Sequence, residues 1–424
     1  MNIEFGLTNG STNTNYAPLA ALLAYYQYNQ TLKPLENVRI PIKTRDFSPS
    51  DKLTQVLLSI LADCETLYEV NPRLKSEVRL AQVGHWKRFA DQSNLSRTLD
   101  TLTLKQIDPL RTATTEIWRL HSLTYQHDWR SYLWLDFDLS GLPCGKQGEA
   151  GRKGYFAGQR NTTGRQLARV SAVRYRETIW SGLYPGNRHT VRCLRPAVLA
   201  AENALELASK QRRRTVWRMD GGAGSDAQIR WLIERDYHLV VKGTSNRRAK
   251  ALARQVQRWD PYGDCWLGEV TSPVDFGRPA RVFVKRRCKD EKFVHSYYVA
   301  TISLPSKGHF LACYDARGGA EVEQFRNDKS GLGLAARRKR AFCGQQGLVL
   351  LTDLAHNLLA DFYHVALTGT RFDSYGPKRI VRDLFSIPGN LVFEAGELKR
   401  IELLSLKQFS RELLICLEKY CLGE

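Results

Sequence analysis

Two acidic residues in one short apolar segment have the spacing of metal ligands. The segment SYLWLDFDLSGLP, residues 131–143, has the composition of a β-strand. Alternation along a strand puts Asp136 and Asp138 on one face and the apolar residues that alternate with them on the other. Two carboxylates on one face of an apolar strand are costly without a positive charge nearby. A divalent cation would supply that charge. The alternatives are a pair of acids on an edge strand and ion pairs with arginine side chains.

A third acid ends a second predicted strand. In TVWRMDGGAGSDAQIRWLIERDYHLVVK, residues 215–242, Asp220 is followed by a glycine-rich turn and then by a predicted helix. Ser225 and Gln228 have the spacing of a capping box at the start of that helix. A carboxylate at a strand end, beside glycines that leave space around it, suits a metal ligand in an α/β protein. The alternative is an aspartate in an ordinary strand–helix turn.

A fourth acid lies in a later segment. In YDARGGAEVEQFRNDK, residues 314–329, the Gly318-Gly319 pair is predicted to open a helix with Glu321 in its first turn. Carboxylates that are distant in sequence but converge at one edge of a mixed sheet can hold two divalent cations about 3.5–4 Å apart. Such a pair activates water on one side of a phosphodiester and stabilises the leaving oxygen on the other. Hard oxygen ligands favour Mg²⁺ or Mn²⁺.

The charge balance of the chain points to a polyanionic partner. The 424 residues include 63 Lys and Arg against 43 Asp and Glu, a net charge of +20. Nucleic acid is the simplest partner for such a chain, and its phosphates would make binding salt-sensitive. A basic surface without a specific partner is the alternative. Composition does not distinguish DNA from RNA.

Cysteine usage and the lack of long apolar runs predict a soluble cytoplasmic protein with no membrane partner. The nine cysteines are scattered and show no C-x-x-C pair, so we expect reduced, mostly buried thiols. The first residues do not have the pattern of a secretory signal, and no apolar run approaches the length of a membrane span.

The first part of the chain, residues 1–125, is predicted to be helical. Helical spacing and caps indicate short helices at residues 50–68, 76–83, 86–90 and 94–99, and another that begins after Thr103 with Gln106 as its capping partner. Short helices with tight turns, and Arg97 on one of them, suit a helix-turn-helix that reads a DNA groove. A helical bundle without DNA contacts is the alternative.

The middle of the chain predicts a mixed sheet. Strands at 131–143, 170–173 and 178–183, a helix at 189–213 and the strand before Asp220 form a first core part, residues 126–255. A β-rich block at 256–310 reads as an inserted antiparallel sheet. Its basic residues would track a nucleic-acid backbone or, alternatively, blunt an exposed edge strand.

The remaining residues are assigned to two parts. Residues 311–370 would complete the core, with a buried helix at 348–359 and the basic run 337–340 on an exposed helix end. Residues 371–424 are predicted to form a C-terminal helical region that serves support or dimerisation.

Three segments resemble the DDE transposases of bacterial insertion sequences. LDFDLSGLP resembles the first-acid strand of that family, in which Ser or Thr follows the aspartate by two residues, and this favours Asp138 over Asp136 as the ligand. RMDGGAGSDAQIRWLIERDYHLVVKG resembles the second-acid segment, with Asp220 as the ligand. The resemblance covers roughly residues 50–365 and implies an RNase H-like catalytic core with a β-rich insertion.

The third segment resembles the Tyr/Arg/Glu/Lys signature of the same family. It supplies Tyr314, Arg317, Glu321 and Lys329. The family usually places the lysine seven residues after the glutamate. Here Lys329 lies eight residues after Glu321, and Asp328 takes the seventh place.

The resemblance also implies the roles of other residues and the reaction. Arg317, Lys329 and Tyr314 would grip phosphates, Lys242 would add a phosphate contact, and Trp266 would stack on an unpaired base. The implied protein is a homodimer on double-stranded DNA, associated with the bacterial nucleoid. It would bind terminal inverted repeats, cleave the element ends and join them to target DNA, with two Mg²⁺ or Mn²⁺ per site. The alternatives are an inactive or domesticated DNA-binding relative and an RNase H-like nuclease that does not transpose.

Overall fold

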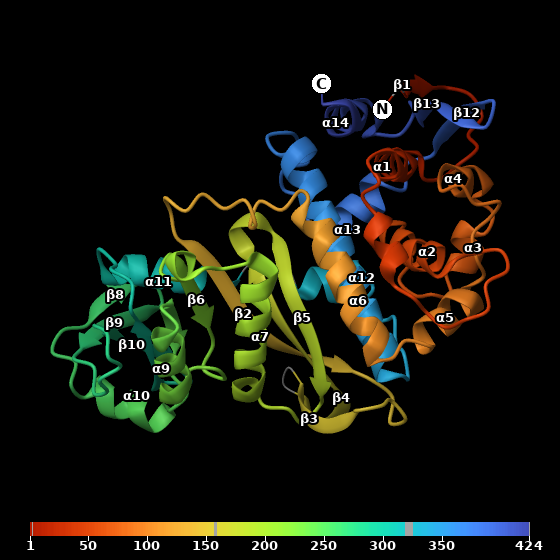
Figure 1. Ribbon diagram of the computed structural model, residues 1–424. Coiled ribbons are helices and arrows are strands. Elements are labelled where there is room, and N and C mark those ends of the chain that lie inside the picture. Colours follow the sequence, from red (N-terminus) through yellow and green to blue (C-terminus); the bar gives the residue numbers. More distant parts are fainter. Residues whose placement is uncertain (2, 157–158, 319–324, 424) are drawn as a thin grey trace. The chain divides into compact units, whose positions relative to one another are not determined.

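The computed structural model describes residues 1, 3–156, 159–318 and 325–423. The chain divides into two compact units (Figure 1). Unit 1 consists of Met1–Ser122, Cys144–Glu149 and Phe325–Glu424, and unit 2 consists of Leu123–Pro143 and Ala150–Gln324. No helix in the described part of the chain has both the length and the apolar character needed to cross a membrane.

Unit 2 is built on a mixed sheet, which confirms the predicted mixed α/β fold. Its strand order among the described residues is β3-β4-β2-β6-β7-β11-β10-β9-β8, with β5 paired to β4. The strands are β2 (Leu133–Pro143), β3 (Arg152–Phe156), β4 (Gln159–Ala172), β5 (Glu177–Pro185), β6 (Thr215–Met219), β7 (His238–Lys242), β8 (Asp260–Tyr262), β9 (Cys265–Val270), β10 (Arg281–Lys289) and β11 (Lys292–Ala300). The pairs β2–β6 and β6–β7 are parallel, and the other pairs are antiparallel.

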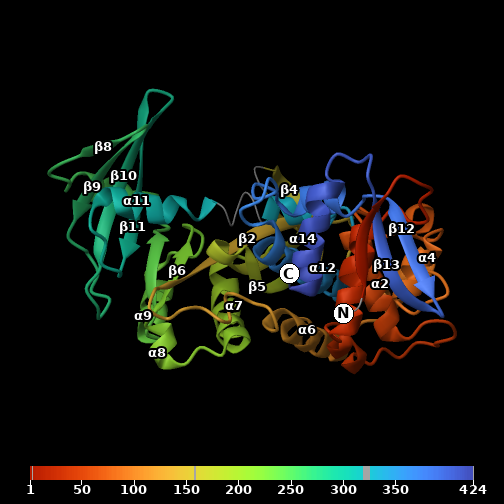
Figure 2. The same ribbon diagram turned by 90° about the horizontal axis from the view of Figure 1, so that it is seen from above.

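The helices of unit 2 lie on both faces of this sheet (Figure 2). They are α7 (Thr190–Leu205), α8 (Ser209–Arg212), α9 (Asp226–Glu234), α10 (Asn246–Ala253) and α11 (Lys307–Asp315). Ser225 precedes α9 as predicted, but its side chain makes no capping hydrogen bond. Gln228 instead accepts a hydrogen bond from Arg195 and donates one to the Val191 carbonyl, so the predicted capping box was wrong.

The β-rich block at 256–310 continues the central sheet. We expected an inserted antiparallel sheet, and β9, β10 and β11 are indeed antiparallel. However, β11 pairs with β7 through Tyr298 and Lys242, so these strands extend the same sheet that carries β2 and β6.

Unit 1 combines the two ends of the chain. Its helices are α1 (Ala17–Tyr28), α2 (Pro49–Leu61), α3 (Val70–Leu74), α4 (Val78–Val83), α5 (Gln92–Asp100), α6 (Leu104–Arg119), α12 (Phe342–Phe362), α13 (Pro377–Arg379) and α14 (Ser410–Leu422), with short 3₁₀ and π turns between some of them. A small sheet has the order β1 (Glu4–Thr8), β13 (Glu397–Leu404), β12 (Gly389–Glu394), and β1 is parallel to β13. Residues from both ends share one hydrophobic core, so residues 325–370 join unit 1 and not the sheet of unit 2.

Several predicted helices differ from the observed ones. The helix predicted at 50–68 ends at Leu61, because Asp63 has a left-handed backbone with φ of 56°. Residues 86–90 are not helical. The predicted caps of α6 are confirmed, since Thr103 and Gln106 form a capping box. The buried helix at 348–359 is confirmed as part of α12.

The prediction that the basic run 337–340 is an exposed helix end was wrong. Arg337 is 2% exposed and donates hydrogen bonds to the backbone carbonyls of Leu332 at 2.5 Å and Ser59 at 3.2 Å. Lys339 is also buried, and its ammonium lies 2.6 Å from the Asp100 carboxylate. These two cations hold a loop onto the helices of unit 1, and the two residues that alternate with them are exposed.

Candidate active site

Two of the predicted metal ligands lie at the same level in neighbouring strands of unit 2. The parallel pairing of β2 and β6 reaches Phe137 opposite Met219. Asp138 follows Phe137 in β2, and Asp220 directly follows the last residue of β6, so alternation turns both away from the buried row of Phe137 and Met219. Their carboxylates therefore start from adjacent positions on one face of the sheet.

Lys242 continues this row on the next strand. Met219 pairs with Val241, so Lys242 stands beside the position of Asp220. Lys242 also pairs with Tyr298 of β11. A cation thus follows two carboxylates across three adjacent strands, which is an arrangement suited to a negatively charged substrate bound near metal ions.

Asp136 occupies the row before these carboxylates and forms an ion pair. Its two carboxylate oxygens lie 2.8 Å from Nε and 2.6 Å from Nη2 of Arg218. Asp136 is 1% exposed and Arg218 is 5% exposed, and the guanidinium also lies 5.2 Å from the ring centre of Trp134. The alternative of an ion pair with arginine therefore describes Asp136. Asp138 is half-buried.

The turn after Asp220 orients its carboxylate. The Gly222 N–H donates a 2.9 Å hydrogen bond to Oδ1 of Asp220. A Cβ on Gly224 would lie 1.9 Å from the carbonyl oxygen of Lys242, so this position requires glycine. The close approach packs the turn against the end of β7 and fixes the strand end that carries Asp220.

Helix α11 lies on the same face of the sheet as Asp136 and Arg218. Phe310 stacks on Phe283 of β10 with ring centres 4.2 Å apart. At the other end of the helix, the Cys313 carbonyl accepts a 2.8 Å hydrogen bond from Nη1 of Arg218. The helix thus runs across the sheet from β10 towards β6. Glu321, six residues beyond the end of α11, lies outside the described residues, as does Gly319 of the pair that was predicted to open its helix.

The basic residues of the Tyr/Arg/Glu/Lys signature fall in both units. Tyr314 is in α11, where its ring packs 4.7 Å from that of Tyr298. Arg317 is 6% exposed, with its guanidinium 5.7 Å from the Tyr314 ring centre. Lys329 belongs to unit 1 and lies 5.6 Å from the ring centre of Phe325.

Arg97 is exposed on α5 of unit 1. Its Nε donates to the Ser93 carbonyl at 3.2 Å, and its Nη2 donates to the Asn94 side chain at 3.2 Å. These local bonds orient the guanidinium along α5 without burying it, so it remains accessible to a phosphate.

The basic residues of the β-rich block are largely engaged within unit 2. Arg281 pairs with both carboxylate oxygens of Glu269 at 2.8 and 2.9 Å. Lys285 is buried, and its Nζ lies 3.9 Å from Oδ1 of Asp315. The guanidinium of Arg286 lies over the ring of Trp266, 5.1 Å from the ring centre. Because Leu267 faces the core that includes Phe310, Trp266 points to the opposite face of the sheet from α11.

The donor types at the row of acids fit a hard divalent cation. Asp138 and Asp220 offer carboxylate oxygens, which Mg²⁺ and Mn²⁺ prefer. Among the residues that the structure describes, no group of three or more His, Cys, Asp or Glu side chains could hold a metal ion. Glu321, which the sequence analysis predicts as the third acid, lies outside the residues that the structure describes.

Sequence reasoning missed Arg218. Its position carried a readable signal, because Arg218 precedes Asp220 by two residues just as Asp136 precedes Asp138. Residues with this spacing share a face of a strand. In two adjacent parallel strands they form two successive rows, one an ion pair and the other a pair of acids.

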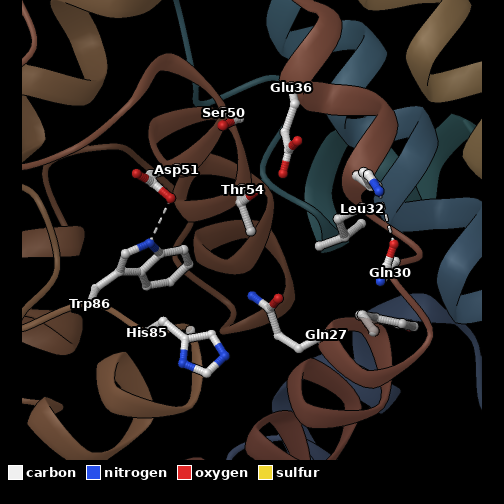
Figure 3. Close-up of a pocket in the computed structure, with 12 residues that line it drawn as sticks. Gln27, Gln30, Leu32, Glu36, Ser50, Asp51, Thr54, His85 and Trp86 are labelled. Atoms are coloured by element: carbon white, nitrogen blue, oxygen red, sulfur yellow. Dashed lines mark hydrogen bonds between the residues drawn. The ribbon is translucent and has the colours of Figure 1, made fainter.

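A pocket of about 390 Å³ lies in unit 1 (Figure 3). It is lined by Tyr26, Gln27, Gln30, Leu32, Lys33, Glu36, Ser50, Asp51, Thr54, Gly84, His85 and Trp86. Asp51 is already engaged there, since it accepts hydrogen bonds from the Trp86 indole at 2.8 Å and from the Ser48 N–H at 2.7 Å. None of the predicted site residues lines this pocket.

A mixed sheet with acids at adjacent parallel strands is an arrangement that suits phosphoryl transfer. The comparison with protein families identifies the family of the chain. The model of transposase DDE domain group 1 matches residues 30–413. The chain therefore belongs to the transposase DDE domain family. No curated protein matches this sequence.

The fold is similar to that of solved structures. One of these is a piggyBac transposase in a synaptic complex with hairpin DNA, determined by cryo-EM. The TM-score is 0.50 at 12% sequence identity, over 86% of this chain and 79% of that chain. At this identity the similarity concerns the fold.

Proposed function

We propose that this protein is a metal-dependent transposase that cleaves the ends of a DNA element and joins them to target DNA. The observation that carries the proposal is the row formed by Asp138 and Asp220 on adjacent parallel strands of a member of the DDE family. The core of unit 2 would then be RNase H-like, with Glu321 as the third acid.

The proposed site divides the work between acids and cations. Asp138, Asp220 and Glu321 would hold two Mg²⁺ or Mn²⁺ ions, which when bound supply charge stabilisation at the attacked and leaving oxygens of a phosphodiester. Lys242 stands beside Asp220 and would bind a non-bridging phosphate oxygen. The Gly222 hydrogen bond orients the Asp220 carboxylate, which supports a preorganised ligand at this position.

Other basic residues would bind the DNA outside the reacting bond. Arg317, Lys329 and Tyr314 would contact phosphates near the cleaved end, and Arg97 on α5 would contact the terminal repeats. The net charge of +20 supports a partner with many phosphates. An element has two DNA ends, and cleavage and joining of both ends require two copies of the site. This is the reason to propose a homodimer on DNA.

The experiment that tests the function is an end-cleavage assay on DNA that carries the flanking inverted repeats of the gene. Wild-type protein is expected to cut in Mg²⁺ or Mn²⁺ and to bind without cutting in Ca²⁺. The variants Asp138→Asn and Asp220→Asn should retain DNA binding and lose cleavage, because each removes a charged metal ligand. Asp236→Asn is the matched control, since this half-exposed aspartate lies at the end of α9, outside the proposed site. Retained cleavage in either site variant would remove that residue from the site, and full turnover in Ca²⁺ would refute the metal scheme.

Binding of the terminal repeats needs a separate test within the folded chain. A truncation near residue 125 would divide unit 1, whose core contains residues from both ends of the chain. Substitution of Arg97 by alanine avoids this problem. We expect weaker binding to all DNA and a salt dependence reduced by about one phosphate contact, with wild-type thermal stability. Unchanged affinity and salt slope would exclude Arg97 from the DNA interface.

A further inference from the structure

Arg218 joins three elements of unit 2 at one point. Its Nε and Nη2 bind both oxygens of Asp136 on β2, and its Nη1 binds the carbonyl of Cys313 on α11, while its own backbone is in β6. The guanidinium is buried and stacked 5.2 Å from the ring centre of Trp134. The planar, charged side chain is thus held in one orientation by both of its hydrogen-bonding edges and by one of its faces.

The position of this network relative to the acids gives it a possible role beyond stability. Asp136 is two residues before Asp138, and Arg218 is two residues before Asp220. The bidentate pair therefore ties together the two strands one row below the acids, where a shift of one strand along the other would move Asp138 relative to Asp220. A carboxylate pair whose spacing is fixed in advance binds a metal ion more tightly than one that must adjust.

The third contact of Arg218 concerns the segment that follows α11. Cys313 lies near the C-terminal end of that helix, and the chain continues from there to Glu321. The Cys313 hydrogen bond holds this end of α11 at β6 and not elsewhere along the sheet. The same guanidinium thus sets the starting point of the segment that carries the third acid.

We propose that Arg218 is a positioning residue for metal binding: it fixes the two acid-bearing strands and the end of α11, and so sets the spacing at which Asp138 and Asp220 bind divalent ions. This inference rests on the proposed function. Arg218 touches neither DNA nor metal in this scheme. Its loss should change the affinity for metal before it changes the affinity for DNA.

A matched pair of ion pairs separates this role from ordinary stabilisation. Arg235 also makes a bidentate pair, with Glu202, at 3.0 and 2.5 Å, and Glu202 is buried. That pair joins α7 to the end of α9 and involves neither acid-bearing strand. Arg218→Met and Arg235→Met each remove one guanidinium from a buried carboxylate in the same unit. Arg218→Lys and Arg235→Lys keep the charge but lose the bidentate geometry, and they serve where a methionine variant does not fold.

Three quantities are measured for each variant: Mn²⁺ affinity of the DNA-free protein by electron paramagnetic resonance, the Mg²⁺ concentration for half-maximal end cleavage, and DNA affinity in Ca²⁺. For Arg218→Met or Arg218→Lys we expect a loss of metal affinity of about 10-fold or more, as for other residues that orient metal ligands. DNA affinity in Ca²⁺ should stay within about twofold of wild type, a change of under ~0.5 kcal/mol. Arg235 variants should lose thermal stability and keep the wild-type metal affinity.

The outcomes separate the inference from the proposed function. Wild-type metal affinity in the Arg218 variants, or an equal loss in the Arg235 variants, would overturn the positioning role even if the wild-type protein cleaves DNA. A wild-type protein that does not cleave DNA, but whose Mn²⁺ affinity falls in both Asp220→Asn and Arg218→Met, would refute the transposase proposal and support the positioning role.

Discussion

Nδ1 of His356 lies 2.7 Å from Oδ1 of Asp328, and both side chains are buried in unit 1. Asp328 stands seven residues after Glu321, where the related transposases usually have a lysine. Its engagement with α12 shows that this position supports the structure of unit 1. Lys329, the lysine that the sequence analysis assigns to the signature, is the next residue and is half-buried beside Phe325.

Substitutions at these two adjacent positions should affect different properties, the stability of unit 1 at Asp328 and the binding of DNA at Lys329. Asp328→Lys is expected to destabilise unit 1 by about 3–5 kcal/mol, because it breaks a buried polar pair and places an ammonium in the core. Lys329→Ala should leave the free energy of unfolding nearly unchanged and weaken binding to cleaved DNA ends. Urea denaturation and DNA titration of both variants measure the two effects. A stable, active Asp328→Lys protein would contradict the assignment.

Arg337 and Arg338 make a second adjacent pair with different expected effects. Burial lowers the pKa of Arg337 to about 10, and its guanidinium reaches the backbone carbonyls of Leu332, Ser59 and Cys64. Arg337→Ala should cost about 2–4 kcal/mol of unfolding free energy, because carbonyl groups at the end of α2 lose their donor in a buried site. Arg338 is exposed, so Arg338→Ala should stay within about 0.5 kcal/mol of wild type. Equal stability of the two variants would refute this interpretation of the loop.

The glycine turn after β6 should not tolerate a side chain at Gly224. A methyl group there would lie 1.9 Å from the Lys242 carbonyl oxygen, so Gly224→Ala must move the turn away from β7. We expect lower thermal stability of unit 2 and a loss of end cleavage larger than the loss of DNA binding. Gly145→Ala is the control, because a Cβ at that position meets no atom within 4 Å. Wild-type cleavage by Gly224→Ala would show that the turn does not orient Asp220.

The buried His127 and the half-buried His238 should make unit 2 sensitive to acid. Burial lowers the pKa of His238 and of His127 below the ordinary value of about 6.5. The folded state therefore favours neutral imidazoles, and the unfolded state binds more protons at pH values between the folded and unfolded pKa. The stability they contribute is present above about pH 6.5 and is lost as the pH falls through the lower, folded pKa. Melting temperatures of wild type and His127→Asn/His238→Asn between pH 8 and pH 5 should converge as the pH falls. A constant difference between them would contradict the lowered pKa values.

Much of unit 2 could be predicted because its signals are local. The alternation in β2 and the run of strand, glycine turn and helix around Asp220 are set by neighbouring residues, and the structure has both. The position of Asp138 relative to Asp220 depends on which strands pair and in what register. The alternation of side chains along each strand does not give that pairing. The Asp136–Arg218 pair was missed for that reason, although both residues are in strands that were predicted.

Most of unit 1 could not be predicted because its organisation is long-range. Its core joins α1 and α2 to α12 and α14. More than 200 residues, most of them in unit 2, separate the first pair of helices from the second in the sequence. Helical spacing identified α2 and α12 separately but carries no information on which helices share a core. The basic run 337–340 shows the same limit, since its partners Ser59 and Asp100 lie far away in the sequence.

The parallel pairing of β1 with β13 has a consequence for how the chain is made. β1 is complete within the first residues synthesised, whereas its partner β13 ends at Leu404. Translation at about 5–20 residues per second separates the two by tens of seconds. The apolar sides of α1 and α2 must wait through that interval, while the sheet of unit 2 can already form. A ribosome that stalls or a message that ends early would release a molecule with a finished sheet in unit 2 and an open, aggregation-prone N-terminal part.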